Sequence, residues 1–251
     1  MGFYDLPKEQ RIHLMQEIQQ TIHHELNMGK YLRSMGYFKD EDTYIRKAAY
    51  LAIGRIYESD KKLETVVLQF LQHAVLQPAH HIRQTAINAA GEIGKKDFYV
   101  VEFFFDKGLF DQHHTVRNAV IGSIKKMGEK NPKPVLQCAK KYLHHPDKEI
   151  RREICHGIEL RGRTHPQDIL PLLKELQNDN TARVRNTLVH VIGQIAYKKG
   201  CLATVVEHLK DWDNTALVKD ALEEIIDVHH RYRNFAVLTQ QQARAYISEN
   251  F

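Results

Sequence analysis

The feature that most constrains this chain is a repeat with the length of one helical hairpin. A dipeptide of an aliphatic residue followed by a basic one recurs six times, first at an interval of 37 and then of 34 residues. The dipeptides are Ile45-Arg46, Ile82-Arg83, Val116-Arg117, Ile150-Arg151, Val184-Arg185 and Val218-Lys219. Self-similarity at such a period is typical of repeat architectures, in which each repeat is one supersecondary unit.

Apolar residues follow each basic residue, called the anchor from here on, at helical spacing. After Arg83 they are Ala86, Ile87, Ala90 and Ile93. Steps of three, four and seven residues place such side chains on one face of an α-helix. Glycine recurs eight residues after the anchor, at Gly54, Gly91 and Gly193. Because Gly costs about 1 kcal/mol relative to Ala inside a helix, its recurrence at one register predicts the close approach of a neighbouring helix.

A second apolar-periodic segment precedes each anchor helix, and a short polar stretch separates the two. The preceding segments include 63–75, 99–109, 134–143 and 169–176, and the polar stretches are 39–42, 77–79, 145–147, 178–181 and 211–215. Asp, Asn and Thr in these stretches are residues that cap helix N-termini. Each repeat is therefore predicted to consist of helix A, a turn and helix B. One hairpin cannot bury its own apolar face, so the hairpins must stack.

The predicted fold is all-α, a right-handed α-solenoid of about six helical hairpins. It is expected to form a single domain over residues 1–251, with polar capping helices at both ends. Residues 1–38 are predicted to form one long or two short capping helices, 39–230 the repeats, and 231–251 a C-terminal cap.

The first repeat carries the pattern Asp-x-x-aliphatic-Arg followed by helically spaced apolar residues and Gly, in the segment DTYIRKAAYLAIG at 42–54. In this motif the chain resembles the HEAT-repeat family, especially its short bacterial repeats, over roughly residues 39–230. The resemblance implies a structural role for the anchor Arg, which is expected to bond to Asp or to carbonyl groups in the preceding turn. It also implies that helix B lines the concave side of the solenoid.

More remotely, the chain resembles the HEAT-like DNA alkylation repair proteins. That resemblance implies DNA binding, with Trp, Asp and Arg gathered on the concave face for base excision. Here the single Trp is Trp212, just before the last helix B, and Asp220 directly follows the last anchor. No Trp stands beside an Asp in the central repeats, so the sequence does not favour glycosylase activity.

The cysteines and the apolar runs bear on the compartment. Cys138, Cys155 and Cys201 form no CxxC pair and are odd in number, so neither a disulfide framework nor a Cys-based metal site is expected. No purely apolar run reaches the 18 residues that a membrane span needs. A cytoplasmic protein without membrane association is predicted.

Reactive residue types form no recognisable catalytic pattern. The 16 His include five adjacent pairs, but neighbouring side chains on a helix point about 100° apart. The pairs are therefore interpreted as exposed turn residues, and no metal site is predicted. There is no Gly-x-Ser-x-Gly elbow and no Gly-rich phosphate loop. No catalytic residue and no cofactor is assigned, and an enzyme is the less favoured class.

A polar stripe follows helix B at the positions one and five after the anchor, which share a helix face. In the fourth and fifth repeats these positions hold Arg152, His156, Asn186 and His190. If helix B lines the concave side, the stripe is a polar groove suited to an extended ligand, although a solvated helix face would show the same pattern.

Basic residues also gather at the end of each helix B, and stacking would align them as a ridge. The central members are Lys95, Lys96, Lys125, Lys126, Arg161, Arg163, Lys198 and Lys199. Basic residues at a helix C-terminus complement the helix dipole, by about 0.3–1 kcal/mol each. Residues 111–210 nevertheless carry 18 Lys and Arg against 10 Asp and Glu, a net charge of +8, which would suit an anionic partner.

Two functional classes remain from the sequence. The favoured one is a monomeric, non-enzymatic binding or scaffold protein that holds a protein or peptide in its concave groove. The alternative is a nucleic-acid-binding protein, in which the ridge contacts phosphates and the stripe faces the ligand.

Overall fold

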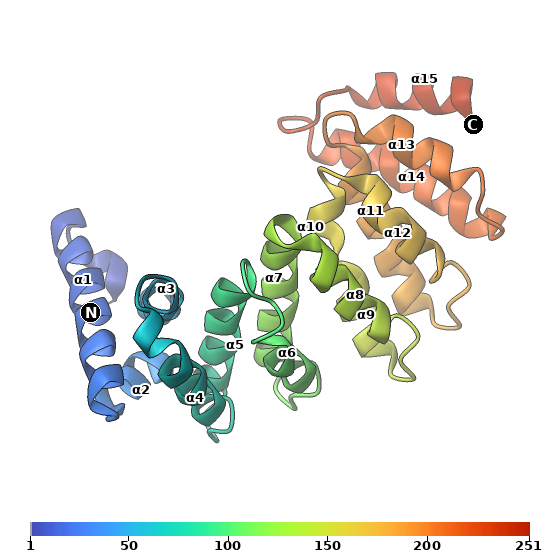
Figure 1. Cartoon of the computed structure of the whole chain (residues 1–251). Helices are drawn as coiled ribbons and strands as arrows, with labels where there is room; N and C mark the ends of the chain where they lie inside the picture. The colour runs from blue at the N-terminus through green and yellow to red at the C-terminus, as the bar shows by residue number, and fades with distance from the viewer. Residues whose placement is uncertain (1) are drawn as a thin grey trace. The chain divides into compact units, whose positions relative to one another are not determined.

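The computed structural model describes residues 2–251, and every regular element within that range is a helix. Seventeen elements follow one another (Figure 1). They are η1 (Phe3–Asp5), α1 (Lys8–Met28), α2 (Leu32–Lys39), α3 (Thr43–Ser59), η2 (Lys61–Leu63), α4 (Glu64–Ala74), α5 (His80–Gly94), α6 (Glu102–Leu109), α7 (His114–Lys130), α8 (Pro132–Tyr142), α9 (Lys148–Gly157), α10 (Glu159–Gly162), α11 (Pro166–Lys174), α12 (Ala182–Ala196), α13 (Cys201–Leu209), α14 (Thr215–Arg231) and α15 (Gln240–Asn250). Among the described residues, no helix combines the length and the apolar character needed to cross a membrane.

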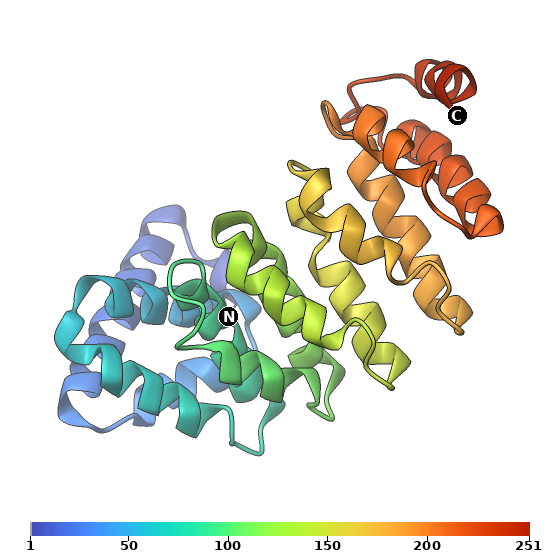
Figure 2. The ribbon, with the colours of Figure 1, turned by 45° about the vertical axis from the view of Figure 1, so that its right-hand side comes forward.

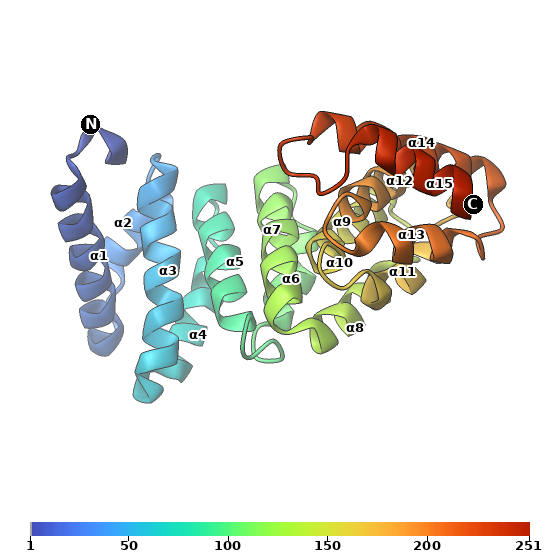
Figure 3. The ribbon, with the colours of Figure 1, turned by 90° about the horizontal axis from the view of Figure 1, so that it is seen from above.

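The helices group into two compact units, Met1–Asn131 and Pro132–Phe251. In the first, α3, α5 and α7 pack side by side as the row of B helices, and α1 packs against α3 (Figure 3). The A helices α4 and α6 pack against this row, and α2 contacts α1, α3 and α5. Side chains such as Ile53, Phe70, Ile87 and Phe104 are buried between the layers.

The second unit repeats the arrangement with α9, α12 and α14 as its B helices. They follow the A helices α8, α11 and α13, and the hairpins succeed one another from yellow to red in Figure 2. The C-terminal helix α15 packs against α13 and α14. Ile154, Leu170, Leu188 and Ile225 are fully buried in this unit. The predicted all-α solenoid architecture is confirmed, while the single domain over 1–251 stays a prediction.

Polar residues of the turns begin several B helices as predicted. The side chains of Asp42, Asp147 and Asn214 accept hydrogen bonds from backbone N–H groups in the first turns of α3, α9 and α14. In the turn before α7 the cap is His113, whose ring accepts from the backbone of Thr115. These bonds satisfy donors that a helix leaves without partners at its start.

The anchor arginines tie each B helix to the turn that precedes it. Arg46 Nη1 donates to the carbonyls of Asp40 and Glu41, at 2.5 and 3.0 Å. Arg117 Nη1 donates in the same way to the carbonyls of Asp111 and Gln112, at 2.7 and 3.2 Å. The carbonyl contacts implied by the HEAT resemblance are thus confirmed.

The carboxylate partner of the anchor lies in a different turn from the one expected. Arg83 donates to both oxygens of Asp111, at 2.7 and 2.9 Å, and Arg151 to both oxygens of Asp179, at 2.6 and 3.0 Å. Each Asp stands 28 residues after its Arg, in the turn of the following repeat. Stacking brings successive turns together. One guanidinium nitrogen therefore donates to carbonyl groups of the preceding turn, and the other two donate to the carboxylate in the turn of the next repeat.

The recurring glycines allow close approach of the next helix, as predicted. A Cβ placed on Gly91 would lie 2.7 Å from Cβ of Ser123 in α7, and one placed on Gly193 would lie 2.7 Å from Cγ of Glu224 in α14. Real Cβ atoms do not approach side chains this closely. By contrast, a Cβ at Gly122 in α7 would meet nothing within 4 Å.

Exchanging these glycines for Ala is expected to have opposite effects. Gly91→Ala should lower the free energy of unfolding by about 1–3 kcal/mol, because the added methyl overpacks the α5–α7 contact. Gly122→Ala, the matched control, should raise it by about 0.5–1 kcal/mol through helix propensity alone. Urea denaturation followed by circular dichroism measures both, and equal effects of the two substitutions would contradict the packing role of Gly91.

Removing the carboxylate from the Arg83–Asp111 pair should destabilise the first unit. Burial by itself raises the pKa of Asp111, but the hydrogen bonds from Arg83 and from the backbone of His113 outweigh it, so the pKa lies below its usual value. The stabilisation is therefore complete above about pH 4, the unfolded pKa, and is lost as the pH falls through the lowered folded pKa. Asp111→Asn should cost about 3 kcal/mol at pH 7, since it leaves the guanidinium buried without its counter-charge.

Thermal unfolding at several pH values tests this expectation, with Glu9→Gln, an exposed carboxyl of the same unit, as the control. The difference in stability between the wild type and Asp111→Asn should shrink at acidic pH, and a difference that grows there would contradict it.

Candidate functional site

The B helices α9 and α12 form a polar groove in the second unit. It is an open hollow of about 510 Å³ lined by Arg152, His156, Arg183, Asn186, Thr187 and His190, called the α9–α12 groove from here on. Four of these residues are the ones predicted from the positions one and five after the anchor. Their registers coincide because the repeats are 34 residues apart, so that the rings of His156 and His190 meet edge to face, with 6.2 Å between centroids and 74° between planes.

Two groove residues, Arg183 and Thr187, are not part of the sequence prediction. They lie two residues before and two after the anchor Arg185, and therefore three residues before Asn186 and His190 on the same helix. Residues three and four apart share a helix face. Extending the predicted stripe to the positions three residues before its members would therefore have included both.

The cations of the groove already have carboxylate partners. Arg152 Nε lies 3.0 Å from Glu149 Oε2, and Arg183 Nε lies 3.1 Å from the other oxygen of the same carboxylate. Arg152 Nη2 also lies 3.4 Å from Glu153 Oε1. The groove thus presents guanidinium, imidazole, amide and hydroxyl groups with a small net charge.

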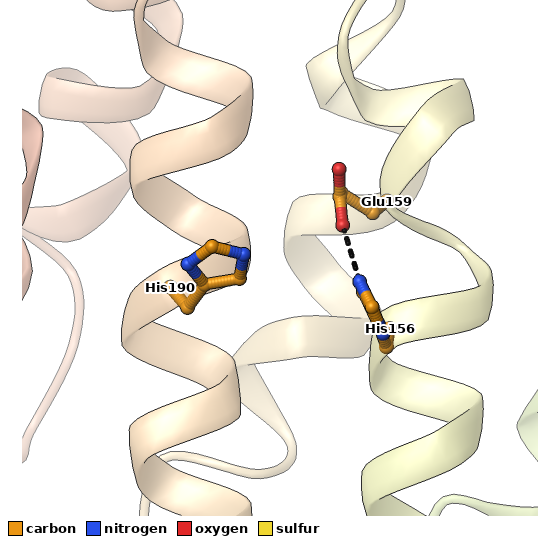
Figure 4. Close-up of side chains that lie close together, drawn as sticks. All are labelled: His156, Glu159 and His190. Carbon is orange, nitrogen blue, oxygen red and sulfur yellow. Dashed lines mark ion pairs between the residues drawn. The ribbon is translucent and has the colours of Figure 1, made fainter. Parts of the chain in front are cut away.

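A buried carboxylate lies beside the two groove imidazoles. The side chain of Glu159 is 1% exposed, and its Oε2 lies 3.1 Å from His156 Nε2 (Figure 4). Its other oxygen pairs with Arg163 Nη2, which in turn donates to Gln194 Oε1 at 3.0 Å. The nitrogen and oxygen atoms that His156, Glu159 and His190 could offer to a metal ion lie within 4.8 Å of one another.

The predicted ridge residues at the ends of the B helices are mostly engaged within the protein. In the first unit Lys95 pairs with Glu92, Lys96 with Glu58, and Lys126 lies 3.7 Å from Glu92 and over the ring of Tyr50. Lys125 beside them is half-buried. Lys96 stays 70% exposed despite its ion pair.

In the second unit the predicted basic residues divide into paired and open ones. Arg161 is only 14% exposed and lies 2.6 Å from Asp168, and Arg163 belongs to the buried network around Glu159. Lys198 lies over the ring of Tyr197 at 4.3 Å, and Lys199 is exposed. Arg161 and Arg163 are thus less available to a phosphate backbone than the two lysines.

The histidines of the adjacent pairs differ in burial and in contacts. His80 and His113 stack face to face, with 3.7 Å between ring centroids and 14° between planes, a geometry in which the two rings do not aim nitrogen atoms at one point. The interpretation of all pairs as exposed turn residues is wrong for His229, which is buried in α14 with Nδ1 at 2.8 Å from the carbonyl of Ile225.

Comparison with known proteins identifies the fold. No protein-family model matches the chain, and curated proteins give no match either. Among solved structures, AlkD2 from Streptococcus mutans superposes with a TM-score of 0.54 and 16% identity, over 82% of this chain and 97% of that one. The protein smu.31 from Streptococcus mutans UA159 gives 0.47 and 18%, over 83% and 97% of the two chains.

A designed armadillo repeat protein in complex with the peptide (KR)4 gives a TM-score of 0.37 and 17% identity, over 77% and 98% of the two chains. At such identities the likeness concerns the fold alone. The assignment of the fold rests on the superposition with AlkD2. The chain has the fold of a HEAT-like helical repeat protein, as the motif at 42–54 implies.

The three cysteines form no disulfide with one another, and all three are buried. Burial raises the pKa of Cys155 far above its usual value and also raises that of Cys201. Since the thiolate is the nucleophilic form, neither group is activated for catalysis.

Native protein should therefore react very slowly with Ellman's reagent, and denatured protein should release three equivalents. Rapid modification of one thiol in the native state, followed by absorbance, would contradict the assignment of all three cysteines to the core.

Proposed function

We propose that this protein is a non-enzymatic binding protein that holds an extended polypeptide partner in the α9–α12 groove. The observation that carries the proposal is the convergence of donor and acceptor side chains from two successive B helices on one open hollow. Asn186 offers both a donor and an acceptor, and Thr187 does so through its hydroxyl. A polypeptide backbone, which alternates N–H and C=O groups, matches such a surface.

The charge of the groove favours a polypeptide over a nucleic acid. A phosphate backbone gains most from cations without internal partners, because its binding comes from neutralised phosphates and released counterions. Arg152 and Arg183 share Glu149, so binding a phosphate would require breaking these pairs. A polypeptide with mixed side chains can instead add hydrogen bonds while the ion pairs persist.

A second candidate, nucleic-acid binding, is favoured by the net charge of +8 over residues 111–210 and by the exposed lysines Lys96 and Lys199. In that case the lysines at the ends of the B helices would contact phosphates, and affinity would fall steeply with salt.

Site-specific photo-crosslinking in a cell extract tests the proposal. A benzoyl-phenylalanine in place of Thr187 should give discrete products that disappear on protease but not on nuclease treatment. The double substitution Arg183→Ala, Asn186→Ala should abolish them, because it removes hydrogen bonds from the groove while leaving the core intact.

The matched control carries the same photo-crosslinker in place of Lys133, an exposed residue of the A helix α8. Equal products from both positions, or products removed by nuclease, would contradict a polypeptide partner in the groove. Fluorescence anisotropy with labelled duplex DNA, single-stranded DNA and duplex RNA separates the second candidate. Binding at about 50 mM salt that weakens about tenfold or more at about 200 mM would favour nucleic acid.

A further inference from the structure

The repeat anchored by Arg151 differs from three of the others at one register of helix B. Eight residues after the anchor, where three repeats carry Gly54, Gly91 and Gly193, the repeat anchored by Arg151 carries Glu159. In those three repeats a Cβ at this register would collide with the neighbouring helix. The repeats anchored by Arg117 and Lys219 carry Lys125 and Asp227 there. In the repeat anchored by Arg151 the helix is interrupted between α9 and α10, and a carboxylate is buried at this register.

A buried carboxylate costs free energy unless its charge is compensated, so the groups around Glu159 show how its charge is stabilised. Glu159 lies between an imidazole on its own helix, His156, and a guanidinium, Arg163. The adjoining Arg163 Nε and Gln194 Nε2 are buried without a hydrogen-bond partner among residues 2–251. Both atoms are N–H donors, so a water molecule or another acceptor would satisfy them, and they show only that the protein's own groups do not complete this polar cluster.

The positions of the three side chains suit a metal ion. Zn²⁺ binds His nitrogen and carboxylate oxygen at about 2.0–2.2 Å. Two such atoms that subtend an angle of about 100° at the metal lie about 3.1 Å apart, and His156 Nε2 and Glu159 Oε2 are separated by 3.1 Å. His190 faces the same point from α12 (Figure 4).

His190 on α12 supplies the third candidate ligand. One of its ring nitrogens lies within 4.8 Å of the candidate ligand atoms of His156 and Glu159. Because the side chain is 43% exposed, rotation about its torsions can bring this nitrogen closer, to coordination distance from a shared ion. Its Nδ1 lies 3.6 Å from Glu224 Oε1 of the next B helix. A metal-bound His commonly donates its other ring N–H to a carboxylate, which fixes the ring and makes it a better ligand.

We propose that His156, Glu159 and His190 form a zinc-binding site on the wall of the α9–α12 groove. Two imidazoles and one carboxylate are the ligand set of open zinc sites, in which a fourth position takes water or a group from a bound molecule. Both His residues line the hollow, so this fourth position faces the groove. Around the proposed site, Arg152 and Arg183 pair with Glu149, and Arg152 also lies near Glu153. Arg163 pairs with the proposed ligand Glu159, and Arg231 with Glu224.

Titration of the metal-free, full-length protein with Zn²⁺ by calorimetry, and with Co²⁺ by visible absorption, tests this site. One tight equivalent per chain is expected, with Co²⁺ bands of a four-coordinate centre. His190→Ala should weaken this equivalent by at least about tenfold, the scale on which even outer-shell changes act. The ring is exposed, so the variant should fold normally.

The matched control is His144→Ala, which removes an exposed imidazole that also pairs with a carboxylate, Glu175 at 2.8 Å, in the same unit. It should leave the tight equivalent unchanged. Glu159→Gln should abolish the Co²⁺ bands while circular dichroism confirms folding. Absence of a tight equivalent, or equal losses in His190→Ala and His144→Ala, would overturn the proposal. The inference does not rest on the polypeptide partner, because the titration uses the metal alone.

Discussion

The stack of hairpins depends on the anchor guanidinium. An Arg near the start of helix B has five N–H donors in a fixed plane, so it can bond two groups of atoms in different directions. Arg83 and Arg151 use one nitrogen for the carbonyls of their own turn and the others for the carboxylate of the following turn. These two residues therefore fix both the entry of their own helix and the position of the turn in the next hairpin.

The candidate site follows from this regular spacing together with one irregularity. Because successive B helices are in register, residues 34 apart face each other, and His156 meets His190. Glu159 then stands at the register where three other repeats carry a closely packed Gly, and it brings a buried charge there. A polar cluster is thus placed beside an open groove on the same two helices, which is the arrangement that a binding site with a metal ion needs.

Periodicity alone predicted the B helices, the glycine contacts and four of the groove residues. It also placed polar capping residues correctly at Asp42, Asp147 and Asn214. The carbonyl partners of the anchor were predicted correctly, but its carboxylate partner was misplaced, because a sequence pattern cannot distinguish the turn before a helix from the turn that stacks on it. Glu159 was missed for a related reason: its significance appears only when its register is compared with Gly54, Gly91 and Gly193, and its burial depends on α12. The pairing of Lys96 with Glu58 and of Lys126 with Glu92 is likewise set by packing between repeats.

The measurement that tests the account most directly is anomalous diffraction at the zinc absorption edge from crystals of the protein grown with Zn²⁺. The account predicts one strong peak at about 2.0–2.2 Å from His156 Nε2, a Glu159 oxygen and a His190 nitrogen. Peaks confined to other histidines, with the carboxylate of Glu159 still paired with His156 and Arg163, would contradict it.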